Sequence, residues 1–126
     1  MRHGPALTAL AALITLIPLI VAAPVAAEEP EIVAATVTRM ATAYRVDVTV
    51  RHPDTGWDHY ADGWEVLDGS GARLGYRPLH HPHVDEQPFT RSLTLDLPEG
   101  TRDVFIRAHC PVDGWGAARF RLVVAP

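Results

Sequence analysis

YRVDVTV at residues 44–50 is the clearest strand pattern in the chain, because its apolar and polar side chains alternate without a break. In an extended strand, successive side chains point to opposite faces of the sheet. One face of this strand would carry Tyr44, Val46, Val48 and Val50, and the other would carry Arg45, Asp47 and Thr49. The pattern predicts a strand with one face in a core and the other toward water.

The rest of the chain is divided by turn residues at similar intervals. Further strands are predicted at residues 32–40, 64–67, 73–79, 89–97, 104–109 and 118–124. The turn residues 68–71 (DGSG) predict a hairpin between the third and fourth strands. Seven short strands in about a hundred residues, without helical periodicity, predict an all-β fold: a seven-stranded antiparallel sandwich of immunoglobulin or fibronectin type. Trp64 is expected to fill its core.

The N-terminal segment has the composition of a secretory signal peptide. Arg2 is followed by an apolar run at residues 6–21 and by small residues that end at Ala27. We expect residues 1–27 to be the signal peptide and residues 28–126 the sandwich domain, in a periplasmic or secreted protein without a membrane segment after cleavage. The alternative is an uncleaved N-terminal anchor, for which the apolar run is short.

The charge balance limits the class of partner. Without Arg2, ten arginines and no lysine stand against 15 acidic residues, a net charge of −5. An acidic domain is repelled by phosphate groups, which argues against nucleic acid or an anionic membrane as partner.

The predicted topology gathers the histidines at one end of the sandwich. In such a fold the connections after residues 44–50, 73–79 and 104–109 share one end. These connections carry every histidine after the signal segment and the single cysteine: His52, His59, His80, His81, His83, His109 and Cys110. The opposite end receives turn residues at positions 41–42, 68–71 and 98–100, where we expect no chemistry.

Imidazole and thiolate are the preferred protein ligands of zinc, copper and iron. The predicted metal ligands are His52, His59, His81 and His83, with Cys110 and His109 as completing ligands. We expect a transition metal ion, copper or iron first and zinc next, in a protein that binds or delivers metal rather than turning over a substrate. A histidine that binds metal through one ring nitrogen can donate the N–H of its other ring nitrogen to a carboxylate, which then orients the ring. The nearby carboxylates are those of Asp54, Asp58, Asp85 and Asp113.

Cysteine chemistry without a metal has little support in the sequence. Cys110 is the single cysteine, so it cannot form a disulfide within the chain. His109 precedes it on a predicted strand, and adjacent strand residues point to opposite faces. A cysteine–histidine pair formed by these two neighbours is therefore not expected.

The order of several short motifs resembles the catalytic domain of superoxide reductases and desulfoferrodoxins. The motifs are residues 44–48 (YRVDV), 52–53 (HP), 59–60 (HY) with Trp64 close behind, and Cys110 followed by residues 113–114 (DG). The resemblance implies an immunoglobulin-like sandwich with mononuclear iron, bound in that family by four histidines and one cysteine. His52, His59 and Cys110 match ligand positions, Asp113 stands at the position of the final histidine, and residues 30–32 lack the first one. A site completed by His81, His83 or His109 would be a different metal centre.

Residues 51–56 (RHPDTG) and 59–60 (HY) also resemble the small carrier subunits of the periplasmic sulfur-oxidation (Sox) system. In those proteins the same motifs occur without a metal. This second resemblance implies a metal-free interaction module whose histidine-rich end contacts a periplasmic protein partner. Three functions thus stand open: a metal-binding protein, an interaction module and a redox enzyme like superoxide reductase.

Overall fold

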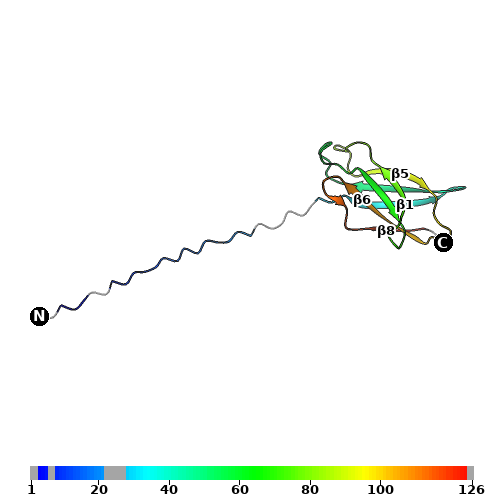
Figure 1. The fold of residues 1–126 in the computed structure, drawn as a ribbon. Coiled ribbons are helices and arrows are strands. Elements are labelled where there is room, and N and C mark those ends of the chain that lie inside the picture. The colour runs from blue at the N-terminus through cyan, green and yellow to red at the C-terminus, as the bar shows by residue number, and fades with distance from the viewer. Residues whose placement is uncertain (1–2, 6–7, 22–27, 125–126) are drawn as a thin grey trace.

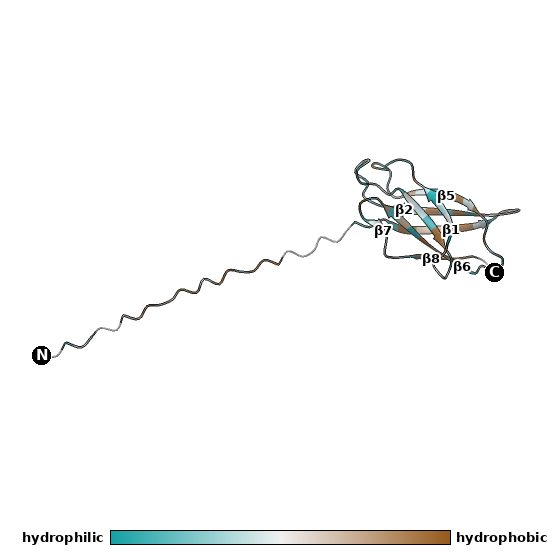
Figure 2. Cartoon of the chain, viewed as in Figure 1, coloured by the Kyte–Doolittle hydropathy of each residue, from teal (hydrophilic) through white to brown (hydrophobic). Residues whose placement is uncertain are grey.

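The computed structural model describes residues 3–5, 8–21 and 28–124. Residues 8–21 extend away from the folded body, exposed and without regular structure, and are mostly apolar (Figures 1 and 2). The predicted end of the signal peptide at Ala27 lies outside the described residues. Within the described ranges, no helix combines the length and apolar character needed to span a bilayer.

Residues 31–123 form two antiparallel sheets, and the predicted all-β sandwich is confirmed (Figure 1). The first sheet has the order β1-β2-β5, with β1 at Glu31–Arg39, β2 at Tyr44–Arg51 and β5 at Phe89–Leu95. The second has the order β4-β3-β6-β7, with β8 also paired to β6. Its strands are β3 (Gly63–Leu67), β4 (Arg73–Pro78), β6 (Asp103–Cys110), β7 (Gly114–Trp115) and β8 (Phe120–Val123).

The described residues contain eight strands rather than the predicted seven. The additional strand, β7, has two residues and pairs with His109 and Cys110 at the end of β6. The predicted strand 118–124 begins later, at Phe120, and β8 pairs with the other half of β6. A two-residue strand has no periodicity, so the sequence pattern does not reveal it.

The core lies between the two sheets. Val46, Val48 and Val50 of β2 are fully buried, as their alternation predicts, and face the other sheet's buried residues. Trp64 is also fully buried, which confirms its predicted place in the core. Burial of each such side chain stabilises the fold by about 1.5–3 kcal/mol.

Strand β3 departs from simple alternation because both of its faces are covered. All five of its residues are buried, including the charged Glu65. The Glu65 carboxylate accepts hydrogen bonds from the Nε atoms of Arg73, at 2.6 Å, and Arg107, at 2.7 Å. These arginine side chains lie over the outer face of the sheet and satisfy the buried charge.

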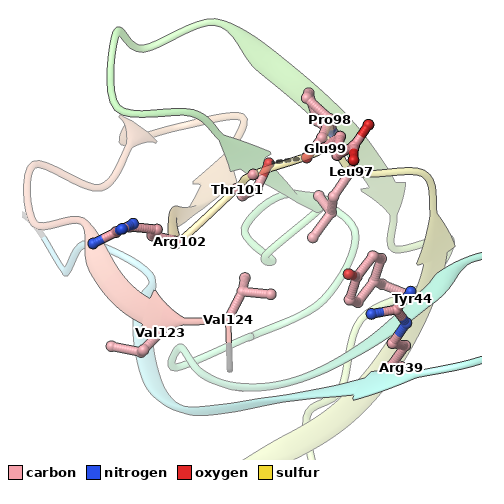
Figure 3. Close-up of a pocket in the computed structure, with 10 residues that line it drawn as sticks. Arg39, Tyr44, Leu97, Pro98, Glu99, Thr101, Arg102, Val123 and Val124 are labelled. Carbon is pink, nitrogen blue, oxygen red and sulfur yellow. Dashed lines mark hydrogen bonds between the residues drawn. The ribbon is translucent and has the colours of Figure 1, made fainter. Parts of the chain in front are cut away.

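The two ends of the sandwich differ in chemistry. At the end formed by the β1–β2 turn and residues 96–102, an open cavity of about 740 Å³ lies between Tyr44, Leu97 and Val124 (Figure 3). Arg39 and Arg102 flank it, and no histidine or cysteine lines it. The connections β2–β3, β4–β5 and β6–β7 meet at the other end, where the backbone N–H of His83 binds the Asp54 carboxylate at 2.7 Å.

Candidate metal centre

Four side chains gather at the histidine-rich end of the sandwich: His52, His59, Cys110 and Asp113. Each offers one ligand atom, and these four atoms all lie within 4.8 Å of one another. Ligand atoms of a tetrahedral ion with bonds of about 2.0–2.3 Å lie roughly 3.3–3.8 Å apart. The group therefore has to contract by up to about 1 Å to surround one ion.

The two buried members of the group come from facing sheets. His52 follows the last residue of β2, and Cys110 is the last residue of β6. Because both strands end on the same side of the core, their side chains converge without a long loop. The sandwich itself thus fixes half of the candidate ligands on rigid elements.

His59 and Asp113 come from the connections. The β2–β3 connection folds back on itself where His59 N–H donates to the Gly56 carbonyl at 3.1 Å, and His59 carbonyl accepts from Thr55 at 2.9 Å. Asp113 lies in the tight turn between β6 and β7, which Gly114 closes at φ = 77°. Glycine adopts this left-handed conformation without the steric cost of a side chain.

One ring nitrogen of His52 faces the group, and the other is bound to the Asp54 carboxylate. Its Nδ1 atom lies 2.6 Å from Oδ1 of Asp54, and both side chains are fully buried. Asp54 also accepts two backbone N–H groups, so Nδ1 carries the proton and donates to the carboxylate. The lone pair is then on Nε2, which is buried and makes no hydrogen bond to any described residue.

A buried ring nitrogen without a partner costs free energy, because it has lost its hydrogen bond to water. Nε2 of His52 points to the group and lies 3.6 Å from Oδ2 of Asp113. A metal ion between these atoms would satisfy both. The residues present therefore fit a metal ion.

His59 and Asp113 form the more exposed half of the group. Nε2 of His59 lies 2.8 Å from Oδ2 of Asp113, and this hydrogen bond is the main cause that lowers the pKa of Asp113. The ring of His59 also contacts that of His52 edge to face, with centroids 4.7 Å apart. Since 22% of the His59 side chain and 12% of the Asp113 side chain are exposed, the group is reachable from solvent on this side.

Cys110 supplies a buried thiol. Burial raises the pKa of the Cys110 thiol, because the thiolate loses the solvation of water. The backbone N–H groups of Val112 and Asp113 act in the opposite direction, since both donate hydrogen bonds to the sulfur. A bound cation would favour the thiolate further, as it does for coordinating thiols generally.

The other predicted ligands from the β4–β5 connection do not join this group. The buried ring of His83 stacks on Phe89, with centroids 3.8 Å apart, and its Nε2 atom lies 2.9 Å from Nη2 of Arg91. His81 is exposed, with its ring centroid 4.6 Å from that of His83. Both histidines therefore lie outside the ligand set of this group.

His109 also lies apart from the four side chains. Its Nδ1 atom is 2.6 Å from Oδ1 of Asp62, and its ring packs against Trp115 with centroids 4.9 Å apart. His109 is partly exposed whereas Cys110 is fully buried, as their adjacent positions on β6 predict.

The sequence predicts Asp113 as an orienting carboxylate, whereas the structure places it among the four candidate ligands. The signal for it was its place where the superoxide reductase pattern has the final histidine ligand. Aspartates are common in turns, so residue type alone could not distinguish Asp113 from Asp58 or Asp85.

No family model matches the chain. A protein of Halomicrobium mukohataei named "Putative lipoprotein" is 47% identical over 74 residues, which are 59% of this chain and 36% of that protein. The chain therefore spans about a third of the length of this curated relative.

A crystal structure of a hypothetical protein from Pyrococcus horikoshii OT3 has a similar fold. The TM-score is 0.54 at 13% sequence identity, and the match covers 77% of this chain and 89% of the other. At this identity the likeness shows the fold alone. Neither comparison identifies the chain as a superoxide reductase or a sulfur-oxidation carrier.

Proposed function

We propose that this protein binds one transition metal ion through His52, His59, Cys110 and Asp113. The observation that carries the proposal is the buried Nε2 atom of His52, which faces the other three side chains without a hydrogen-bond partner among the described residues. Asp54 holds the opposite nitrogen of the ring, an arrangement in which a carboxylate orients a metal-binding histidine.

The donor set favours copper or iron, with zinc next. Two histidines and one cysteine form the trigonal set of copper electron-transfer sites, and His52, His59 and Cys110 provide it. Two histidines and one carboxylate are typical of non-haem iron(II) sites, and His52, His59 and Asp113 provide that set, with Cys110 as the fourth ligand. Zinc accepts all three ligand types, histidine, cysteine and aspartate.

Binding or delivery of metal is favoured over turnover. Four protein ligands complete a four-coordinate ion, whereas a catalytic centre keeps a position open for water or substrate. The solvent-exposed edges of His59 and Asp113 provide a route by which the ion enters and leaves.

We place this activity outside the cytoplasm. The exposed apolar residues 8–21 stand apart from the sandwich, as a signal segment would. The relative from Halomicrobium mukohataei is named a lipoprotein, and lipoproteins are extracytoplasmic, which supports the same location for this chain.

Metal analysis of the purified protein tests the proposal. The protein is stripped with a chelator, titrated with Cu²⁺, Fe²⁺ and Zn²⁺ in separate samples, and desalted before the metal is quantified. Wild-type protein should retain one equivalent of copper or iron, and His52→Gln and Cys110→Ser should not. The matched variants His81→Ala and His109→Ala should behave as wild type. A wild-type protein that retains none of the three metals would remove the proposal.

One observation favours a second candidate, a protein-interaction module. Trp57, Val84 and Val112 are exposed apolar residues, 68%, 51% and 63% exposed, and each comes from a different connection at the histidine-rich end. If these three side chains form one contiguous apolar patch, that patch would mark an interaction surface. Trp57→Ala combined with Val112→Ser should abolish capture of an extracytoplasmic partner by the metal-free protein if this function holds.

A further inference from the structure

We infer that Asp54 is a positioning residue of the metal centre, which presents Nε2 of His52 to the ion and links the centre to the β4–β5 connection. The inference rests on the proposed function. Asp54 touches none of the candidate ligand atoms, so it would act through His52 alone.

The Asp54 carboxylate is fully buried and accepts three hydrogen bonds. Its Oδ1 atom accepts the Nδ1–H of His52 at 2.6 Å and the backbone N–H of Ala61 at 2.9 Å. Its Oδ2 atom accepts the backbone N–H of His83 at 2.7 Å. The two backbone donors fix the carboxylate in place, and the carboxylate in turn fixes the ring of His52.

This arrangement selects the tautomer of His52. In a neutral imidazole one nitrogen carries the proton and the other carries a lone pair, and only the lone pair binds metal. Because the carboxylate accepts from Nδ1, the lone pair lies on Nε2, inside the group. A donor in place of Asp54 would put the lone pair on Nδ1, away from the ion.

The same carboxylate joins the centre to the β4–β5 connection. Gln87 adds a second link, since its Oε1 atom accepts the backbone N–H of His52 at 3.0 Å and its Nε2 atom donates to the His83 carbonyl at 3.0 Å. The conformation of the β4–β5 connection and the position of the His52 ring therefore depend on each other. Metal bound at His52 should slow hydrogen exchange of the His83 amide, since coupling between two sites acts in both directions.

Asp54→Asn tests the inference, because asparagine keeps the shape of the side chain but has one acceptor oxygen and one donor nitrogen. Whichever way the amide is oriented, it loses either its acceptor for Nδ1–H of His52 or its acceptor for His83. Mutation of such partners typically weakens metal binding by about 10- to 100-fold. The matched control is Asp58→Asn, the same change at an exposed aspartate of the same connection, whose carboxylate makes no hydrogen bond or ion pair with His52 or His59, unlike Asp54 and Asp113. Its affinity should stay within about twofold of wild type.

Metal affinities are measured with copper and with iron(II) on all three proteins, and the tautomer of His52 is read from nitrogen NMR of the metal-free wild type. The inference predicts a protonated Nδ1, weaker binding in Asp54→Asn and unchanged binding in Asp58→Asn. A protonated Nε2 in the wild type overturns it, even if Asp54→Asn does not fold. Equal affinity in Asp54→Asn and wild type overturns the inference and leaves the proposed function standing, whereas a wild type that binds neither metal removes both.

Discussion

The Nε2 atom of His52 lies 3.6 Å from Oδ2 of Asp113, too far for a hydrogen bond and with no other partner for this nitrogen among the described residues. Two ligands at adjacent corners of a tetrahedron with bonds of about 2.1 Å lie roughly 3.4 Å apart. The spacing of these two atoms thus already matches two ligands of one ion.

Removal of the Asp113 carboxylate should weaken metal binding. Asp113→Ala deletes the oxygen ligand and the hydrogen bond that positions His59, so we expect affinity to fall at least about tenfold. Competition titration against a chelator measures the change. Asp85→Ala, at an exposed residue outside the group, is the control. Equal affinity in the two variants would show that Asp113 is not a ligand.

Trp64 and Trp57 should differ sharply in their effect on stability. Trp64 is fully buried, so Trp64→Ala should lower the free energy of unfolding by about 3–5 kcal/mol. Trp57 is 68% exposed, so Trp57→Ala should change it by no more than about 0.5 kcal/mol. Urea denaturation of the metal-free proteins compares them. Similar losses in both would contradict the assignment of the core.

Glu65 should contribute more to stability than an exposed ion pair does. Glu65→Ala removes two charge-assisted hydrogen bonds from a buried position and leaves Arg73 and Arg107 unpaired, which should cost about 1.5–3 kcal/mol. Asp103→Ala breaks the exposed pair with Arg121 and should cost less than about 1 kcal/mol. Denaturant midpoints and slopes provide both values, and the reverse order would refute this account of β3.

His83 should make the metal-free protein less stable in weak acid. Burial lowers the pKa of His83 below its ordinary value of 6.5, with smaller contributions from Arg91 and His81. As the pH falls below that value, the unfolded chain takes up a proton that the folded ring resists, so the free energy of unfolding decreases. The contribution of His83 to the free energy of unfolding is fully present above the ordinary pKa of 6.5, and it is lost as the pH falls toward the lowered pKa of the folded protein.

The comparison of His83→Gln with His80→Gln tests this pH dependence. The loss of stability between about pH 7.5 and about pH 5.5 should be smaller in His83→Gln than in wild type. His80 is exposed, so His80→Gln should keep the wild-type loss. A wild-type loss that persists unchanged in His83→Gln would assign the effect to other groups.

Much of the fold follows from local sequence patterns. Alternation at residues 44–50 predicts β2 and its buried valines, and the turn at residues 68–71 predicts the β3–β4 hairpin, which the pairing of Gly63 with Pro78 confirms. The burial of both faces of β3 does not follow from alternation, because Glu65 is covered by arginines from the neighbouring strands. Ion pairs between residues far apart in the sequence do not change the apolar–polar periodicity of one strand, so that periodicity cannot predict them.

The candidate site was only partly visible in the sequence. The topology brings His52 and Cys110 together because both stand where strands end. The three histidines within residues 80–83 favour His81 and His83 as ligands. The direction in which loop side chains point depends on contacts that the sequence does not show, such as the stacking of His83 on Phe89. Asp113 enters the group through a tight turn, and no local pattern distinguishes it from other turn aspartates.

X-ray absorption spectroscopy of the protein loaded with one equivalent of copper or iron identifies the atoms bound to the ion. We expect one sulfur ligand at about 2.3 Å and nitrogen or oxygen ligands at about 2.0–2.2 Å. The sulfur signal should disappear in Cys110→Ser. A loaded wild-type protein whose metal has no sulfur ligand would contradict a centre built on His52, His59, Cys110 and Asp113.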